Sequence, residues 1–258
     1  MKLKNRDTKW YINLIGAGVL LVLWEMSFRL NWVDPFFVSA PSKVFQEGSK
    51  MFTTGKIYPH LWVSAQEFSL GFFLSVTTAI IFGLIIGWYK KIYALLNPII
   101  FAFYSVPHIA LFPLIMIWAG LGIWSKVLII SLGAFFPVLI TTTQAVKNLD
   151  ADYIRLARSF GANDFDLFKT ITLPAAVPYI MTGLRLAVPR ALLGMIAGEF
   201  FASHTGLGYL IVNYGASFQT SRLLAVIFIV VVVSITLTET VAYAEKKLQT
   251  WKPVKMDS

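Results

Sequence analysis

The sequence predicts an all-α membrane protein with six transmembrane helices, and three observations lead to this fold class. The chain of 258 residues is 57% hydrophobic and only 14% charged, whereas an ordinary soluble domain carries about a quarter charged residues. Its apolar runs reach ~20 residues, the length that an α-helix needs to cross a hydrocarbon core about 30 Å thick. Runs such as VIFIVVVVSITL do not alternate as barrel strands would, so helices must pair the backbone groups inside the bilayer.

Six apolar stretches are the expected transmembrane helices of a single domain, residues 1–258. They cover residues 10–29, 65–88, 93–118, 124–146, 175–201 and 223–244. The first stretch is too long for a cleaved signal peptide, and no small-residue cleavage site follows it. The connection between the fourth and fifth stretches, residues 147–174, is charged, and the apolar pattern does not explain it.

The net charge of +9 is distributed unevenly between the two sides of the membrane. If every stretch crosses, most of the 22 Lys and Arg residues fall on the side of both termini and of residues 147–174. Cytoplasmic loops of membrane proteins carry the excess of Lys and Arg. The sequence therefore predicts a multi-pass protein with both termini in the cytoplasm. The excess of basic residues is explained by this topology and does not indicate a nucleic-acid partner.

Residue types that support catalysis or metal binding are few and scattered. The chain has no cysteine, and its three histidines, His60, His108 and His204, lack metal-ligand spacing. It has no G-x-S-x-G elbow, no metalloprotease helix and no G-x-x-x-x-G-K-[ST] phosphate loop. We expect a protein that is not an enzyme and binds no metal or cofactor. If ATP drives a transport step, the ATPase is another chain.

The third stretch is interrupted by proline. Pro98, Pro107 and Pro113 each remove a backbone donor and can kink a helix. Bent helices line many transport pathways, but they also occur as plain packing features. Both interpretations remain open for this stretch.

The fifth stretch combines charged and small residues. Arg190 and Glu199 are costly at membrane depth and rarely face lipid, so they either belong to a solute pathway or gate, or form a buried structural pair. Small residues at roughly four-residue spacing predict a ridge that another helix approaches closely. The ridge consists of Gly183, Ala187, Ala191, Gly194, Gly198 and Ala202.

Residues 147–174 predict two short helices with a sharp turn between them. The capping and breaking residues are Asp150 or Asp152, Gly161, Asn163 and Pro174. Phe165, Phe168 and Ile171 recur at three-residue spacing and form an apolar stripe beside charged residues. Such a stripe usually marks a docking surface, although a helix lying on the membrane has the same pattern.

This loop resembles the "EAA" loop of ABC importer permeases, E-A-A-x3-G-x9-I-x-L-P. The matching residues are Ala157, Gly161, Ile171, Leu173 and Pro174, with the glycine-to-proline spacing intact. Segments along nearly the whole chain, among them PSKVF, LGAFFPVLITT and GLGYLI, are similar to the nitrate/sulfonate/taurine-type branch of binding-protein-dependent permeases. The chain therefore looks like the transmembrane permease subunit of an ATP-driven importer.

The resemblance implies the type I ABC importer permease fold, a homodimer, and a location in the bacterial cytoplasmic (inner) membrane. Two cytoplasmic ABC ATPase subunits would bind ATP and Mg, and an extracytoplasmic solute-binding protein would deliver the solute. The loop 147–174 would be the coupling helix in a groove of the ATPase. The residues expected at this contact are Arg155, Leu156, Ala157, Arg158, Gly161, Phe165, Phe168, Ile171, Leu173 and Pro174.

The chain departs from the family pattern at two places. Arg155 stands where the family usually has an acidic residue, and Leu156 stands where alanine is usual. The reversed charge suits an ATPase groove with a compensating acidic residue. Glu67 occupies a position where a basic residue is expected, and the sequence offers no account of it.

The predicted translocation pathway contains Tyr104, Ser105, His108, Arg190 and Glu199. Relatives that handle small anions often carry a basic residue near the break in the third span, whereas Tyr104 and His108 suit a flat, weakly charged heterocycle such as a vitamin precursor. The predicted solute is therefore sulfonate-, taurine- or nitrate-like, or such a heterocycle. The alternative function is an ion-gradient-driven secondary transporter, for which Glu199 is the candidate carboxylate.

Overall fold

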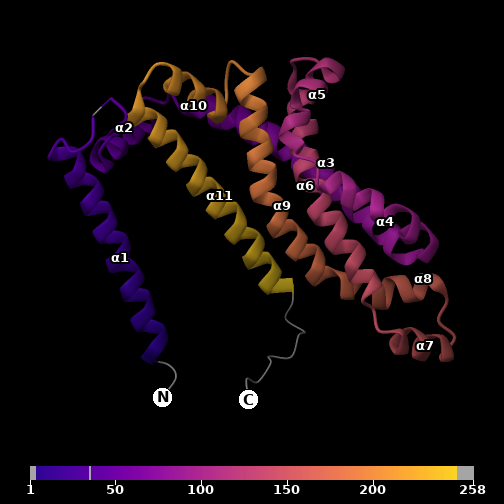
Figure 1. The fold of residues 1–258 in the computed structure, drawn as a ribbon. Helices are drawn as coiled ribbons and strands as arrows, with labels where there is room; N and C mark the ends of the chain where they lie inside the picture. The colour runs from indigo at the N-terminus through magenta and orange to yellow at the C-terminus, as the bar shows by residue number, and fades with distance from the viewer. Residues whose placement is uncertain (1–3, 35, 249–258) are drawn as a thin grey trace.

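The computed structural model describes residues 4–34 and 36–248, with side chains from residue 15 onward. Within these ranges the chain forms helices and no strand (Figure 1). The α-helices are α1 (Lys4–Arg29), α2 (Pro41–Thr53), α3 (Tyr58–Trp88), α4 (Lys90–Tyr104), α5 (Phe112–Ala119), α6 (Ile123–Lys147), α7 (Ala151–Ser159), α8 (Asp164–Leu167), α9 (Leu173–Ala202), α10 (Leu207–Ala216) and α11 (Thr220–Leu248). A 3₁₀ turn, η1 (His108–Leu111), precedes α5, and a π turn, η2 (Phe168–Thr172), joins α8 to α9.

Among the described residues, four helical units are long and apolar enough to cross a membrane. They are α3, α6, α11 and the continuous unit Asp164–Ala202, which contains α8, η2 and α9. They coincide with the second, fourth, fifth and sixth predicted stretches. Helix α1 covers the first, but several basic residues used for the topology prediction have side chains outside the described part: Lys2, Lys4, Arg6, Lys9, Lys252 and Lys255.

The third predicted stretch is not a single helix. Helix α4 and the η1–α5 segment form an angle of 84°, and only when taken together do they make a fifth candidate span. The break lies at residues 105–107, where Pro107 has extended backbone angles and no N–H to continue the helix. Pro98 stays inside α4, and Pro113 lies in the first turn of α5, where proline is tolerated.

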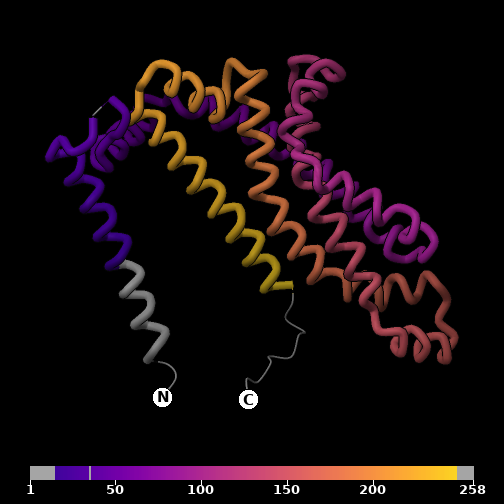
Figure 2. The backbone as a smooth tube through the Cα atoms, viewed as in Figure 1, coloured from indigo at the N-terminus to yellow at the C-terminus, as the bar shows by residue number. Residues whose placement is uncertain are grey.

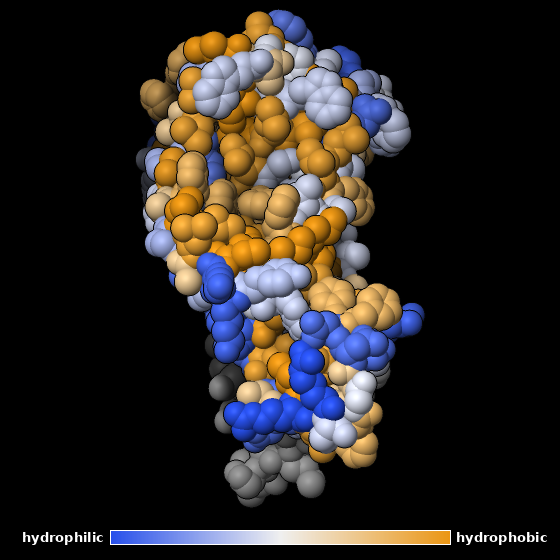
Figure 3. All heavy atoms as spheres, turned by 90° about the vertical axis from the view of Figure 1, so that its right-hand side faces the viewer, coloured by the Kyte–Doolittle hydropathy of each residue, from blue (hydrophilic) through white to orange (hydrophobic). Residues whose placement is uncertain are grey.

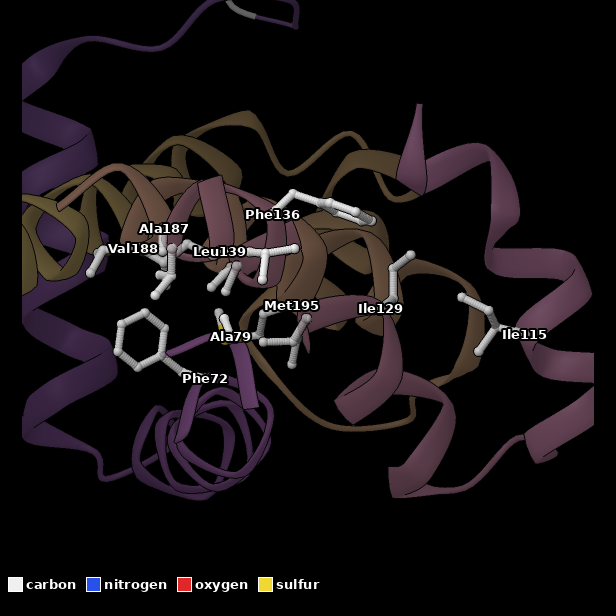
Figure 4. Close-up of a cluster of buried hydrophobic side chains, with 14 of the residues drawn as sticks. Phe72, Ala79, Ile115, Ile129, Phe136, Leu139, Ala187, Val188 and Met195 are labelled. Atoms are coloured by element: carbon white, nitrogen blue, oxygen red, sulfur yellow. The ribbon is translucent and has the colours of Figure 1, made fainter. Parts of the chain in front are cut away.

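Helix α6 lies at the centre of the bundle, between α3 and α9. Its Ile129, Phe136 and Leu139 belong to one buried hydrophobic cluster with residues of α3 and α9, and Leu139 lies nearest to Phe72 and Val188 (Figure 4). The predicted small-residue ridge of α9 is confirmed, because a Cβ added to Gly194 would lie 3.0 Å from the Ile129 carbonyl oxygen. A second ridge, on α3, was not predicted and brings that helix equally close to α6. Its buried small residues are Gly71, Ser75, Ala79, Gly83 and Gly87.

The bundle has two unlike ends. At the α10 end, helices α2, α10 and α11 pack together, and Arg222 Nε donates a 2.7 Å hydrogen bond to Glu47 Oε2. This bond lowers the pKa of Glu47. The α7 end carries the charged loop, and the backbone trace shows α7 and α8 far from α10 (Figure 2). Helix α1 contacts α2 and otherwise stands apart from the bundle.

Candidate functional site

Three of the five predicted pathway residues meet at the break between α4 and η1. Arg190 Nη2 of α9 donates a 2.7 Å hydrogen bond to the Tyr104 hydroxyl, and its guanidinium carbon lies 4.7 Å from the Tyr104 ring centroid. Arg190 and His108 line a cavity of about 340 Å³, which we call the arginine cavity. Its other lining residues are Pro107, Ile109, Ile129, Gly133, Leu193 and Gly194.

The histidine of the arginine cavity has an unused polar atom. His108 Nε2 is buried and has no hydrogen-bond partner in the described part of the chain. Its ring packs against Phe136, with the two ring centroids 5.5 Å apart. The wall of the arginine cavity thus carries one permanent cation and one imidazole with a buried nitrogen among otherwise apolar residues, and the Tyr104 phenol holds the cation at its edge.

Arg190 lies near the middle of α9. At a rise of about 1.5 Å per residue, it is about 26 Å from Leu173 and about 18 Å from Ala202. Its side chain is exposed on the surface of the single chain. A guanidinium at this depth rarely faces lipid, so this surface must face a water-filled pathway or another protein chain.

Ser105 and Glu199 lie outside the arginine cavity. The Ser105 hydroxyl donates to the Phe101 carbonyl of its own helix at 2.9 Å. Glu199 is fully buried at the α10 end, where its carboxylate accepts hydrogen bonds from the Ser64 hydroxyl and from the Gly208 N–H, both at 2.5 Å. Both residues therefore make internal contacts rather than lining this cavity.

A second buried pair lies beside Glu199 and accounts for the unexpected Glu67. Glu67 of α3 forms an ion pair with Lys126 of α6, and these side chains are only 2% and 9% exposed. Lys126 Nζ also donates to the Ser203 hydroxyl at 2.7 Å. We call Ser64, Glu67, Lys126 and Glu199 the α10-end polar cluster. Neither Ser64 nor Lys126 was predicted as a site residue, although each stands near the start of an apolar stretch.

The turn into α10 fits closely over this cluster. Gly206 has φ = +120°, a conformation that only glycine adopts readily, and a Cβ there would lie 2.4 Å from Glu199 Cδ. The Gly206 N–H donates to His60 Nδ1 at 3.1 Å, and the Leu207 N–H donates to Ser64 Oγ at 2.9 Å. The α10-end polar cluster is thus a cross-link between α3, α6, α9 and the start of α10. Across the described ranges, no group of three or more His, Asp or Glu side chains could hold a metal ion.

The caps predicted for the charged loop are confirmed. Asp150 accepts a hydrogen bond from the Asp152 N–H at 2.9 Å and caps α7. Asn163 and Asp166 form a reciprocal capping box at the start of α8. Gly161 has φ = +83° in the turn between the two helices. The local sequence therefore specifies this turn without help from distant residues.

The second helix of the loop is not a separate element, contrary to prediction. Helix α8 continues through η2 into α9, and the Leu173 N–H bonds to the Phe168 carbonyl five residues back. Pro174 follows directly and has no N–H to donate, and a wide turn relieves the contact of its ring with the preceding turn. A displacement of α8 is consequently a displacement of the end of a membrane helix.

The predicted apolar stripe of α8 divides between two surroundings. Phe165 is exposed, whereas Phe168 packs edge-on against Trp88 with the ring centroids 6.1 Å apart. Leu167, which sequence analysis did not single out, is buried. Ile171 and Ala157 are half-buried, and Leu173, Pro174 and Leu156 are exposed. The stripe is therefore partly a packing surface against the bundle.

The charged residues of the loop pair among themselves. Arg158 forms an ion pair with Asp164 across the Gly161 turn, and Arg155 lies 3.4 Å from Asp152 on the same helix. All four side chains are more than half exposed. The exposed surface of α7 therefore presents both arginines together with Leu156.

The chain resembles known transport proteins over most of its length. Residues 79–250 match the family described as binding-protein-dependent transport system inner membrane component. The aliphatic sulfonates transport permease protein SsuC of Bacillus subtilis is 31% identical over 94% of this chain and 88% of its own. The taurine transport system permease protein TauC of Escherichia coli is 30% identical over 97% of this chain and 96% of its own. The formylaminopyrimidine transport permease protein ThiX of Halalkalibacterium halodurans is 30% identical over 91% of this chain and 93% of its own.

A solved structure has the same fold. A chain of the MetNI methionine ABC transporter in an inward-facing conformation superposes with a TM-score of 0.61. The match covers 76% of this chain and 98% of that chain at 17% sequence identity. This similarity extends the relationship from sequence to helix arrangement.

Proposed function

This chain belongs to the family of inner membrane components of binding-protein-dependent transport systems, and we propose that as a permease subunit it conducts a small organic anion past Arg190. The observation that carries the choice of solute is the exposed guanidinium in the middle of α9, held by Tyr104 at the edge of the arginine cavity. The fold is that of an ABC importer permease, and the chain acts in transport as a multi-pass protein of the inner membrane.

The complete transporter in this proposal contains two copies of the chain. A single copy leaves Arg190 exposed at membrane depth, and a second copy across a shared pathway removes that charge from lipid. Each copy crosses the membrane six times, with both termini and the α7 end in the cytoplasm. An extracytoplasmic solute-binding protein delivers the solute at the α10 end.

The charged loop, residues 147–174, is proposed as the contact with a separate ATPase subunit that binds ATP and Mg. Its exposed apolar and basic side chains, including Leu156, Phe165 and Arg155, support this role because no described residue of the single chain covers them. The continuity of α8 with α9 supports a direct mechanical link, since α9 also carries Arg190. ATP-driven closure of the ATPases would then move the helix that lines the pathway.

The chemistry of the arginine cavity favours an anion over a neutral heterocycle. A guanidinium donates charge-assisted hydrogen bonds to sulfonate, carboxylate or similar oxyanions, and these bonds are stronger than neutral ones. The relatives named for aliphatic sulfonates and for taurine act on solutes that carry such a group, whereas a formylaminopyrimidine does not. We therefore favour a sulfonate-like solute for this chain.

The ion-gradient alternative has less support. Its candidate carboxylate, Glu199, is fully buried, and both of its oxygens already accept hydrogen bonds within the α10-end polar cluster. A carboxylate that binds and releases a coupling ion needs access from a pathway. Glu199 is better explained as part of the cross-link between helices.

The experiment is uptake into proteoliposomes that contain the chain together with the ATPase and binding protein of its own system. We expect ATP-driven uptake of radiolabelled taurine or ethanesulfonate by the wild type. Arg190→Gln should lower this uptake at least about tenfold, because a hydrogen bond to a charged group contributes about 1.5–3 kcal/mol. Arg190→Lys should keep part of the activity, since it retains the charge but loses the planar donor geometry.

Ser105→Ala is the matched control, because the Ser105 hydroxyl bonds to its own helix beside the cavity. This variant should transport as well as the wild type. Equal anion uptake by wild type and Arg190→Gln would refute the role of Arg190. Uptake of a neutral pyrimidine but of no anion would refute the proposed class of solute.

A further inference from the structure

A second, larger cavity lies at the α7 end, away from the proposed pathway. Its volume is about 770 Å³, and it separates α7 from the ends of α3 and α6. Trp88 and Lys147, the last residues of those two helices, form part of its wall. The cavity is thus at the level where two membrane helices end, which is the boundary between the hydrocarbon core and water.

Four basic side chains converge on this cavity from three parts of the chain. Lys90 comes from the start of α4, Lys147 from the end of α6, and Arg155 and Arg158 from α7. We call it the basic cavity. Two carboxylates offset part of this charge, because Asp164 pairs with Arg158 and Asp152 lies near Arg155. The four cations exceed these two carboxylates by two, so the site has an excess of positive charge.

The wall of the basic cavity is also apolar. Trp88, Ile154 and Leu167 line it beside the cations. The space-filling view of this side shows hydrophilic side chains gathered at the lower end, directly beneath a broad hydrophobic surface (Figure 3). Tryptophan is enriched at membrane interfaces, where its ring lies at the level of the lipid headgroups. A free inorganic anion needs only the charges, whereas a phospholipid uses the charges and the apolar wall together.

We propose that the basic cavity binds an anionic phospholipid, with the headgroup phosphate between Lys90, Lys147 and the arginines of α7 and with the upper part of the acyl chains against Trp88. Basic pockets between membrane helices bind such headgroups by the same combination of contacts. The bound lipid would bridge α7 to the ends of α3 and α6. The position of the charged loop would then depend on the presence of anionic lipid, whatever solute the protein transports.

The test is lipid binding to the purified full-length chain in detergent, measured by native mass spectrometry. The probes are dioleoyl phosphatidylglycerol, dioleoyl phosphatidylcholine and inorganic phosphate. We expect the wild type to retain phosphatidylglycerol in preference to phosphatidylcholine. The double variant Lys90→Gln/Lys147→Gln should bind phosphatidylglycerol at least about tenfold more weakly, because each basic residue near a membrane surface adds about fivefold in affinity.

Lys91→Gln is the matched control, since Lys91 is the neighbour of Lys90 but does not line the cavity. It should bind phosphatidylglycerol as the wild type does. Equal binding by the double variant and the wild type would overturn the proposal. Displacement of the lipid by millimolar phosphate would identify a free-anion site instead, and loss of the lipid when the ATPase is added would identify a protein contact. Either result would also overturn it.

Discussion

The continuous α8–α9 unit has charged residues at both of its ends, and the two sets lie in opposite surroundings. At the α10 end, Glu199 is fully buried, and the neighbouring pair of Glu67 and Lys126 is almost completely buried. At the α7 end, the Arg158–Asp164 pair is formed by side chains that are 56% and 68% exposed. One end is thus cross-linked to three other elements, and the other presents its charges to the surroundings.

The difference indicates how one helix can serve both stability and movement. Buried ion pairs contribute little net stability, but removing one partner is costly because the other charge remains buried and unpaired. Exposed pairs are worth about 0–1 kcal/mol and can exchange partners at little cost. The α10 end is therefore suited to hold α9 in place, and the α7 end is suited to bind and follow another protein.

The largest effect on transport is expected at the exposed end. Gly161→Asp should abolish ATP-driven uptake while the chain still inserts into the membrane. Nothing lies within 4 Å of a Cβ at this position, so the internal cost is the backbone penalty of the positive φ alone, and the added carboxylate acts on the partner contact. Uptake by proteoliposomes and co-purification of the ATPase are the measurements.

Gly215→Asp provides the comparison at the opposite end, because a Cβ there also meets nothing within 4 Å. The amount of ATPase that co-purifies with this variant should equal the amount that co-purifies with the wild type. Normal uptake by Gly161→Asp would show that the charged loop is not the coupling contact.

The largest effect on stability is expected at the buried end. Lys126→Met should lower the free energy of unfolding by about 3–5 kcal/mol, because Glu67 is left as an unpaired buried charge. Arg158→Gln at the exposed end should change it by at most about 1 kcal/mol. Denaturant unfolding in detergent, followed by tryptophan fluorescence, measures both values.

The double variant Glu67→Met/Lys126→Met separates charge from packing. Because it removes both charges and keeps side chains of similar size, it should recover most of the stability lost in Lys126→Met. If Lys126→Met and Arg158→Gln lower the free energy of unfolding by the same amount, the proposed difference between the two ends would be wrong.

A smaller effect is expected from paired alanine substitutions at two glycines with positive φ. Gly161→Ala should lower the free energy of unfolding by about 1 kcal/mol, which is the backbone penalty alone, since nothing lies near a Cβ at this position. Gly206→Ala should cost more than about 2 kcal/mol, because its Cβ also collides with the Glu199 carboxylate. The same unfolding measurement applies, and an equal cost at both positions would mean that the Glu199 carboxylate moves aside easily.

Local features of the structure could be predicted from the sequence because they depend on near neighbours. The caps at Asp150 and Asn163 and the stop at Gly161 each follow from one residue and its own backbone. The lengths of the apolar stretches gave the long helices for the same reason. Arg190 was a pathway candidate because a charged residue within an apolar stretch can be recognised from the sequence alone. The three prolines of the third stretch predicted possible kinks, but the sequence did not show that the break would lie at Pro107.

Features that join distant parts of the chain could not be predicted. Glu67 departs from the family pattern, and the sequence could not explain it because its partner, Lys126, lies on another helix. Glu199 was grouped with Arg190 because both are charged residues of one helix, but the fold places them in different surroundings. The continuity of α8 with α9 was missed because Pro174 normally marks a helix start, and only the observed bond from Leu173 to Phe168 shows the wide turn.

That wide turn has a consequence for helical phase. A π turn holds one residue more than an α turn, which corresponds to a rotation of about 100° around the helix axis. The side chains of α8 are therefore out of step with those of α9 by one position. In the observed phase, Leu167 lies against the bundle and Phe165 lies at the surface. A shift of the π turn along the helix would rotate α8 relative to α9 and so change which side chains of α8 lie at the surface.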